Sequence, residues 1–135
     1  MPENIERMKK MIESYALLQR EVGAFFAMSL DLCCIADAST MTFTRLNPRW
    51  EVELGWTEEE LMSKPYTEFV HPDDRDATSS ASSKLVDGIN IVSFVNRYEI
   101  KGGGLAHLEW TSTMDEPSGM VFATARILKK EYREE

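Results

Sequence analysis

The sequence has no long hydrophobic run, no excess of positive charge and no spaced set of cysteines. No apolar stretch approaches the length that crosses a bilayer, and the N-terminal PENIERMKK lacks the apolar centre of a secretory signal. The formal net charge is −8, so a phosphate-binding surface would oppose the field of the whole molecule. We therefore expect a cytoplasmic chain that neither inserts into a membrane nor binds nucleic acid.

Catalytic and metal-binding patterns are also missing. Cys33 and Cys34 are adjacent, which would strain a disulfide between them and gives no metal-ligand spacing, so reduced thiols are expected. No nucleophile stands at a suitable spacing from a base, and the glycines at 102–104 join two strands instead of starting a helix as a phosphate-binding loop does. The sequence therefore predicts no metal site, and a regulatory domain in place of an enzyme.

The first 22 residues predict an amphipathic helix that ends at Gly23. One apolar stripe follows alternating spacings of three and four and is interrupted only by Gln19. The stripe consists of Ile5, Met8, Ile12, Tyr15 and Val22. Because three heptads are the lower limit for a coiled coil, two arrangements stay open: the helix packs on its own domain, or it pairs with a second copy.

A strand period replaces the helical one after this helix. Residues 31–37 and 41–47 form a predicted hairpin, in which Leu32, Cys34 and Ala36 share the side that faces a core.

Helix signals follow the hairpin. Asn47 suits an N-cap with Pro48 at the first helical position, and Thr57 with Glu60 forms a capping box. The HPDDR segment suits a further helix start, where aspartates meet the helix dipole favourably, and leads to a polar helix that ends at Gly88.

The last third of the chain returns to strands. Residues 89–100, 105–114 and 119–128 are separated by a Lys-Gly-Gly-Gly turn and a Glu-Pro-Ser-Gly turn. The order of two strands, several short helices and three strands predicts an α+β fold with a helical insert on one face of a sheet. With 135 residues and 43% hydrophobic content, the chain has enough for one such core.

Several motifs in this order resemble the PAS family. They are LDLCCIAD, TFTRLNPRWEVELGWTEEEL, FVHPDDR and FVNRYEIKGGGLAHLEW. The resemblance covers about residues 24–128 and is strongest to the subtype of bacterial sensory proteins whose last strands carry the PAC motif. It implies a five-stranded antiparallel sheet, a helical insert across one face, and a pocket between the two.

The resemblance also implies a function. PAS domains bind small ligands, cofactors or partner proteins, usually as homodimers, and regulate a kinase, cyclase or transcriptional output, as in histidine kinases of two-component signalling. We therefore expect a sensory domain at 23–128, preceded by the helix at 1–22 and followed at 129–135 by the start of a linker to an output domain. The alternative is a ligand-free module for protein interaction and dimerisation.

The cofactor is not identified, but two are disfavoured. Haem-binding members place an axial histidine on the helix after the His-Pro-Asp-Asp turn, and residues 73–86 contain none. Light-sensing flavin members carry a reactive cysteine near the position of residues 64–67, where this chain has none. The family's usual Asp-Ile-Thr junction to the output is Arg126-Ile127-Leu128 here.

Strand parity and the resemblance together give a set of pocket candidates. In the third predicted strand, residues 92, 94, 96 and 98 share a face, and in the fourth, residues 106, 108, 110, 112 and 114 do so. The pocket candidates are Cys34, Trp50, Tyr66, Phe69, Phe94, Asn96, Tyr98 and Trp110. A buried Asn96 must find partners, so Asn96 and the Tyr98 hydroxyl either point at a ligand or bond to the helical insert.

The opposite face of the sheet is predicted to carry an apolar patch. Met120 and Phe122 fall on the outward side of the last strand, as Ile35 and Val95 do on theirs. Such a patch usually has a cover, and the N-terminal helix is the candidate. We therefore predict a homodimer interface that combines the helical stripe with Met120 and Phe122.

Overall fold

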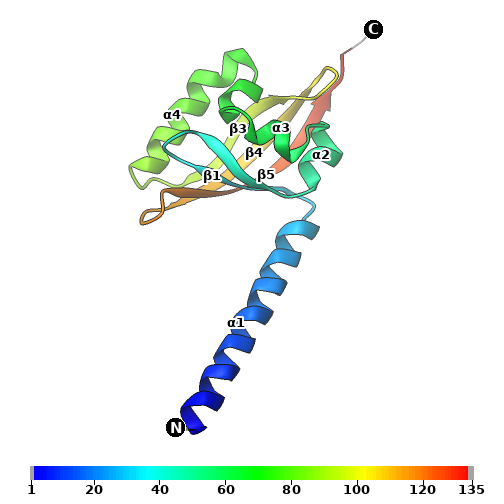
Figure 1. Ribbon diagram of the computed structural model, residues 1–135. Helices are drawn as coiled ribbons and strands as arrows, with labels where there is room; N and C mark the ends of the chain where they lie inside the picture. Colours follow the sequence, from blue (N-terminus) through cyan, green and yellow to red (C-terminus); the bar gives the residue numbers. More distant parts are fainter. Residues whose placement is uncertain (1, 134–135) are drawn as a thin grey trace.

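A five-stranded antiparallel sheet forms the centre of the structure, a computed structural model that describes residues 2–133 (Figure 1). The strand order β2-β1-β5-β4-β3 places the first and last strands of the chain side by side. The strands are β1 Leu32–Asp37, β2 Thr42–Leu46, β3 Ile91–Glu99, β4 Leu105–Asp115 and β5 Met120–Glu131. The predicted α+β class and the five-stranded antiparallel sheet are confirmed.

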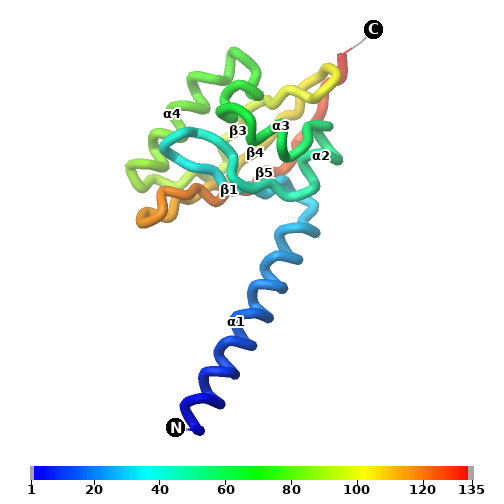
Figure 2. The backbone as a smooth tube through the Cα atoms, in the orientation of Figure 1, coloured from blue at the N-terminus to red at the C-terminus, as the bar shows by residue number. Residues whose placement is uncertain are grey.

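Short helices cover one face of this sheet (Figure 2). They are α2 Arg49–Leu54, α3 Glu58–Met62, the 3-10 turns Tyr66–Phe69 and Pro72–Asp74, and α4 Arg75–Val86. Gly55 ends α2 with a φ of 82°, and the capping box that starts α3 is present: the Glu60 N–H donates to the Thr57 hydroxyl at 3.1 Å, and the Thr57 N–H donates to the Glu60 carboxylate at 3.0 Å.

The predicted N-cap role of Asn47 is wrong. The residue that caps α2 is Pro48, without a side-chain hydrogen bond. The Asn47 side chain instead bonds to the backbones of Phe26, Asp31 and Cys33, which lie before and within β1. Because the amide oxygen faces the Cys33 N–H and the amide nitrogen faces the two carbonyl groups, the side chain is not directed at the start of α2.

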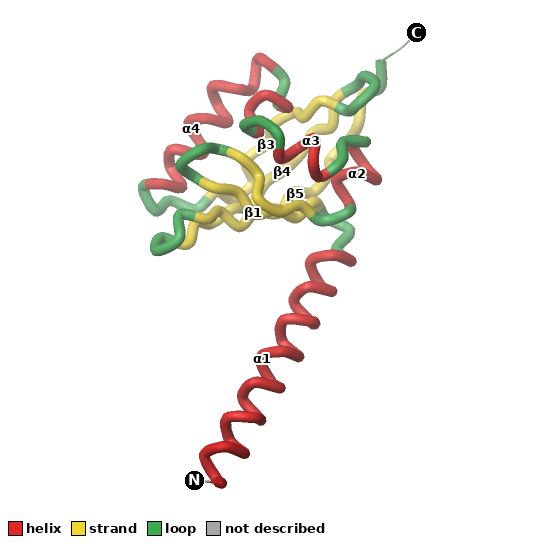
Figure 3. Tube along the Cα trace, in the orientation of Figure 1, coloured by secondary structure: helices red, strands yellow, loops and turns green. Residues whose placement is uncertain are grey.

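Helix α1 runs from Pro2 to Met28, so the predicted end at Gly23 is also wrong. A glycine inside a helix costs only about 1 kcal/mol relative to alanine, which the helix-forming residues on both sides offset. No residue of α1 is buried, and Figures 1 and 3 show the helix projecting away from the sheet. The arrangement in which α1 packs on its own domain is therefore not the one formed. Within residues 2–133, no helix is both long and apolar enough to cross a membrane.

A bulge in β3 changes the predicted parity at its start. Ser93 has a φ of 61°, and the register with β4 shifts between Val92 and Phe94. Because the extra residue turns the strand, Ile91 packs against the core and Val92 is 74% exposed. Beyond the bulge, Asn96 and Tyr98 are buried as predicted.

Strand β5 continues to Glu131, three residues past its predicted end at 128. Its last residues pair with the start of β4, after a second register shift between His107 and Leu108. The turn that precedes β4 fits closely against this extension, since a Cβ on Gly104 would lie 2.6 Å from the Glu131 carbonyl oxygen.

We expect Gly104→Ala to lower the free energy of unfolding by about 3 kcal/mol, because the new methyl group meets backbone atoms at a φ of 119°. Gly102→Ala is the matched control: its φ of 92° is also unfavourable, but no atom lies within 4 Å of the added Cβ. The free energy of unfolding of Gly102→Ala should fall by about 1 kcal/mol. Thermal and urea unfolding followed by circular dichroism would compare the two, and equal losses would contradict the steric explanation.

Candidate ligand-binding site

A cavity of about 50 Å³ lies between the inner face of the sheet and the helical layer. It has room for about three or four water-sized groups. Its walls come from all the strands, from α4 and from the turn that contains Tyr66, and no charged side chain among residues 2–133 lines it. The cavity thus suits a ligand of a few heavy atoms without a net charge, because a buried ion would have no counter-charge there.

Six of the eight pocket candidates line this cavity: Cys34, Tyr66, Phe94, Asn96, Tyr98 and Trp110. Trp50 and Phe69 do not. Both are buried, but Trp50 lies behind the wall, with its ring 5.6 Å from that of Tyr98, and Phe69 packs edge-on against Trp56 at 5.2 Å. Ligand contact by the six stays a prediction.

Asn96 is bonded to its neighbours inside the protein. Its amide nitrogen donates to the Thr78 hydroxyl at 3.1 Å, and its amide oxygen accepts from the Trp110 indole N–H at 2.8 Å. Since Thr78 lies on α4, Asn96 joins the helical insert to the sheet, as the second of its two predicted alternatives requires.

Sequence reasoning missed the polar residues that α4 contributes to the cavity wall. Thr78 and Ser82 stand one helical turn apart and line the cavity with Ala81 and Leu85. The spacings of three and four between these residues predict that they share one face of the helix. Small polar residues are also typical of a solvent-exposed face, however, and only the hydrogen bond to Asn96 shows that this face is turned to the sheet.

Tyr98 differs from the other tyrosine in the wall. The Tyr66 hydroxyl lies 2.6 Å from the Ser82 hydroxyl and forms a hydrogen bond with it. Tyr98 is only 2% exposed, and its hydroxyl makes no hydrogen bond within residues 2–133. Burial keeps the pKa of Tyr98 well above its usual range and also raises the pKa of the Cys34 thiol, so both groups are neutral.

Comparison with known proteins assigns the fold. A sequence model of the PAS fold matches residues 43–124. The chain belongs to the PAS family. No curated protein matches it in sequence.

Solved structures of other PAS domains superpose on it. A domain of a sensory box sensor histidine kinase/response regulator from Geobacter sulfurreducens has 18% identity and a TM-score of 0.73, over 83% of this chain and 96% of that one. The PAS domain of an HTR-like protein from Haloarcula marismortui has 23% identity and a TM-score of 0.67, over 91% and 99%. The PAS-B domain of Drosophila melanogaster Cycle with bound ethylene glycol has 13% identity and a TM-score of 0.64, over 72% and 99%. The protein is a PAS domain, a type of module that is typically regulatory, and its fold is similar to that of the sensor histidine kinase domain.

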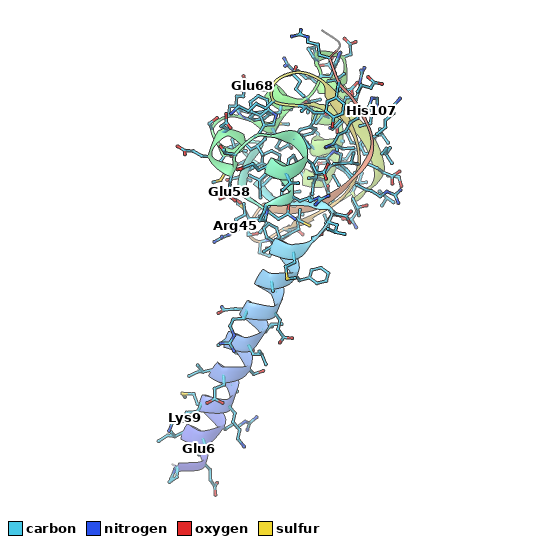
Figure 4. The ribbon with its side chains drawn as sticks, turned by 90° about the vertical axis from the view of Figure 1, so that its right-hand side faces the viewer. Glu6, Lys9, Arg45, Glu58, Glu68 and His107 are labelled. Atoms are coloured by element: carbon cyan, nitrogen blue, oxygen red, sulfur yellow. The ribbon has the colours of Figure 1, made fainter. Side chains whose placement is uncertain are left out.

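The outer face of the PAS sheet carries the predicted apolar patch. Phe122 and Val95 are each 46% exposed, and Met120 and Ile35 are partly exposed. An open groove of about 520 Å³ runs between this face and the C-terminal turns of α1, where Phe25 and Val22 contribute to its lining. Figure 4 shows the side chains of the N-terminal part of α1 standing clear of the domain, with Glu6 and Lys9, an ion pair at 3.7 Å, near the far end.

An ion pair fixes the helical insert beside the cavity. The Asp74 carboxylate accepts from the Arg97 backbone N–H at 2.8 Å and from Nε and Nη2 of the same residue at 2.9 and 2.7 Å. These bonds join the start of α4 to β3 next to Asn96. Hydrogen bonds from the Arg97 side chain are the main reason that the pKa of Asp74 lies below its usual value.

The Asp74 bond predicts acid sensitivity. A carboxyl group whose pKa is lower in the folded state stabilises that state above the unfolded pKa, and this stability is lost as the pH falls through the folded pKa. The wild type should therefore lose stability below about pH 4. Asp74→Asn should be less stable at pH 7 and lose less on acidification.

Urea unfolding at a series of pH values would measure this effect. Asp73→Asn is the matched control, because its side chain is 79% exposed, and it should keep the wild-type pH dependence. Parallel stability curves for Asp74→Asn and the wild type would rule out the role given to this ion pair.

Proposed function

We propose that this PAS domain senses a small, neutral molecule in its internal cavity and signals as a homodimer. The observation that carries the ligand part is the Tyr98 side chain, which lines the cavity, is 2% exposed and makes no hydrogen bond through its hydroxyl within residues 2–133. A ligand that bonds to this hydroxyl gains one hydrogen bond, worth about 1 kcal/mol, whereas a wholly apolar ligand does not.

Size and charge limit the ligand class further. A cavity of about 50 Å³ accepts a few heavy atoms and is far smaller than haem or a flavin. Its lining is mostly apolar, and its polar side chains, among them Tyr98, Asn96 and Ser82, carry no charge. A short alcohol, diol or amide satisfies both conditions. The PAS-B domain of Cycle, solved with bound ethylene glycol, supports a ligand of this size.

Tyr98→Phe is expected to weaken the binding of ethylene glycol about tenfold, because it removes one hydrogen bond to the ligand. The phenyl ring keeps its packing against Trp50 and Trp110, so the fold should be unchanged. Titration followed by amide chemical shifts in ¹⁵N NMR spectra would give both affinities. Tyr132→Phe, at an exposed tyrosine, is the control and should bind as the wild type does.

The NMR titration of the wild type distinguishes a ligand-sensing domain from a ligand-free interaction module. If ethylene glycol, glycerol and acetamide all leave the amides around the cavity unshifted in the wild type, the ligand-sensing function fails and the ligand-free interaction module is favoured.

Helix α1 supports the dimer part of the proposal. Its apolar stripe is exposed along its whole length, with Ile12 at 62% and Tyr15 at 63%. Most helices in proteins are stabilised by packing of an apolar face, which α1 lacks within its own chain. The helix has four acidic and four basic side chains, so two copies do not repel each other. A second copy of α1 is therefore the proposed partner.

Further apolar positions extend the interface beyond the stripe. Met11, Leu18 and Phe25 follow one another at a spacing of seven and are 51%, 52% and 82% exposed. They lie beside the stripe and widen it, and the widened face ends at the groove on the outer sheet, next to Phe122. We propose that the dimer buries the helical stripe and this outer face together. The resemblance to the Geobacter sulfurreducens domain supports a histidine kinase as the output.

Ile12→Glu is expected to convert the dimer into a monomer, because it places a charge in the middle of the paired stripe. Glu13→Gln, on the polar face of the same turn, is the control and should remain dimeric. Size-exclusion chromatography with light scattering would measure both masses. A monomeric wild type, or a dimeric Ile12→Glu variant, would contradict the proposed interface.

A further inference from the structure

The Asn47 side chain connects α1 to the PAS core. It is 2% exposed, and its amide oxygen accepts from the Cys33 N–H at 3.0 Å. Its amide nitrogen donates to the Phe26 carbonyl at 3.1 Å and to the Asp31 carbonyl at 3.0 Å. Phe26 lies in the last turn of α1, where carbonyl groups have no partner within the helix. One side chain thus holds the end of α1, the linker and the start of β1.

Little else fixes the direction of α1. No residue of the helix is buried, and within residues 2–133 only side chains of its last turns, Val22, Phe25 and Phe26, lie beside the sheet, around an open groove. Residues 29–31 join it covalently to β1, and Asn47 bonds at both ends of that segment. The angle of α1 therefore depends on the position of the Asn47 amide and of the Cys33 peptide to which it is bonded.

Trp50 brings the cavity to the same peptide. The Cys33 carbonyl accepts from the Trp50 indole N–H at 3.1 Å and from the Asn47 backbone N–H at 3.0 Å. The Trp50 ring also contacts three cavity-lining rings, with centroid distances of 5.3 Å to Phe43, 5.6 Å to Tyr98 and 5.9 Å to Trp110.

We infer that Trp50, the Cys33 peptide and Asn47 transmit occupation of the cavity to the direction in which α1 leaves the domain. The inference rests on the proposed function, because it requires a ligand at Tyr98. Since protein interiors are close-packed, a ligand that moves the Tyr98 ring also moves the Trp50 ring. Helix α1 has 27 residues and is about 40 Å long, so a tilt of a few degrees at Asn47 displaces its far end by several ångströms.

Two variants interrupt this connection at different points. Asn47→Asp can still accept from Cys33 but cannot donate to the two carbonyl groups, and it places a negative charge at the helix C-terminus. Trp50→Phe keeps an aromatic ring against Tyr98 and removes the bond to the Cys33 carbonyl. Trp56→Phe is the matched control, because its indole donates to the Glu99 carbonyl at 2.8 Å, away from α1.

Residual dipolar couplings of backbone amides, with and without saturating ethylene glycol, would measure the angle of α1 relative to the sheet in the full chain. We expect the angle to change on binding in the wild type and in Trp56→Phe. The change should be lost in Trp50→Phe and Asn47→Asp, although amide shifts around Tyr98 still report binding. If Asn47→Asp does not fold, the change in the α1 angle measured in Trp50→Phe alone tests the connection.

The failures can be told apart. If ethylene glycol binds and the angle of α1 stays constant, the connection is wrong and the ligand proposal stands. An unchanged response in Trp50→Phe also overturns the connection. If no ligand shifts the cavity amides of the wild type, the proposed function fails and the connection fails with it.

Discussion

Trp50 packs against Phe43, Tyr98 and Trp110, and much of the PAS domain depends on this contact because it joins three parts of the fold. The ring lies on α2 and is 1% exposed, so it holds the helical layer against the sheet. Its indole N–H bonds to β1, which pairs with β5 in the middle of the sheet. The rings that it supports form one wall of the cavity. A displacement of Trp50 would therefore reach the cavity, the sheet and the chain that leads to α1.

Most polar side chains in the core of residues 2–133 are hydrogen-bonded, and the fully buried side-chain atoms without a partner are Arg49 Nε and His107 Nε2, away from the cavity lining. Asn47 and Asn96 each bond through both ends of their amides, and the Thr78 hydroxyl donates a hydrogen bond to the Asp74 carbonyl at 2.7 Å. These bonds fix the core in one arrangement. Among residues 2–133, the Tyr66 hydroxyl bonds to Ser82, the Tyr98 hydroxyl makes no hydrogen bond, and no charged side chain lines the cavity. The proposal of a small neutral ligand rests on this uncharged lining.

Helix α2 also reaches the other end of the chain. The Lys130 ammonium on β5 donates to the Glu53 carbonyl at 2.8 Å and forms an ion pair with its carboxylate. A hydrogen bond from Lys130 is the main cause of the lowered pKa of Glu53. The register shift near Leu128 turns Lys130 toward this helix. The ion pair therefore lies just after residues 126–128, where Arg-Ile-Leu replaces the family's usual Asp-Ile-Thr junction. The same short helix thus contacts the strand that follows α1 and the strand that ends the domain.

The sequence by itself determined the order of elements, the faces of most strands and six of the cavity's lining residues, because alternation, capping residues and glycine turns act over a few residues. Three features were decided only in the tertiary structure. The bulge at Ser93 moved Val92 outward, since the register depends on the neighbouring strand. Asn47 bonds to backbone groups up to 21 residues away, where local pattern predicts an N-cap. Tyr98 and Asn96 share a face in the sequence, yet only packing gives Asn96 its partners Thr78 and Trp110 and places Tyr98 at the cavity, because hydrogen bonding between distant segments has no signature in local spacing.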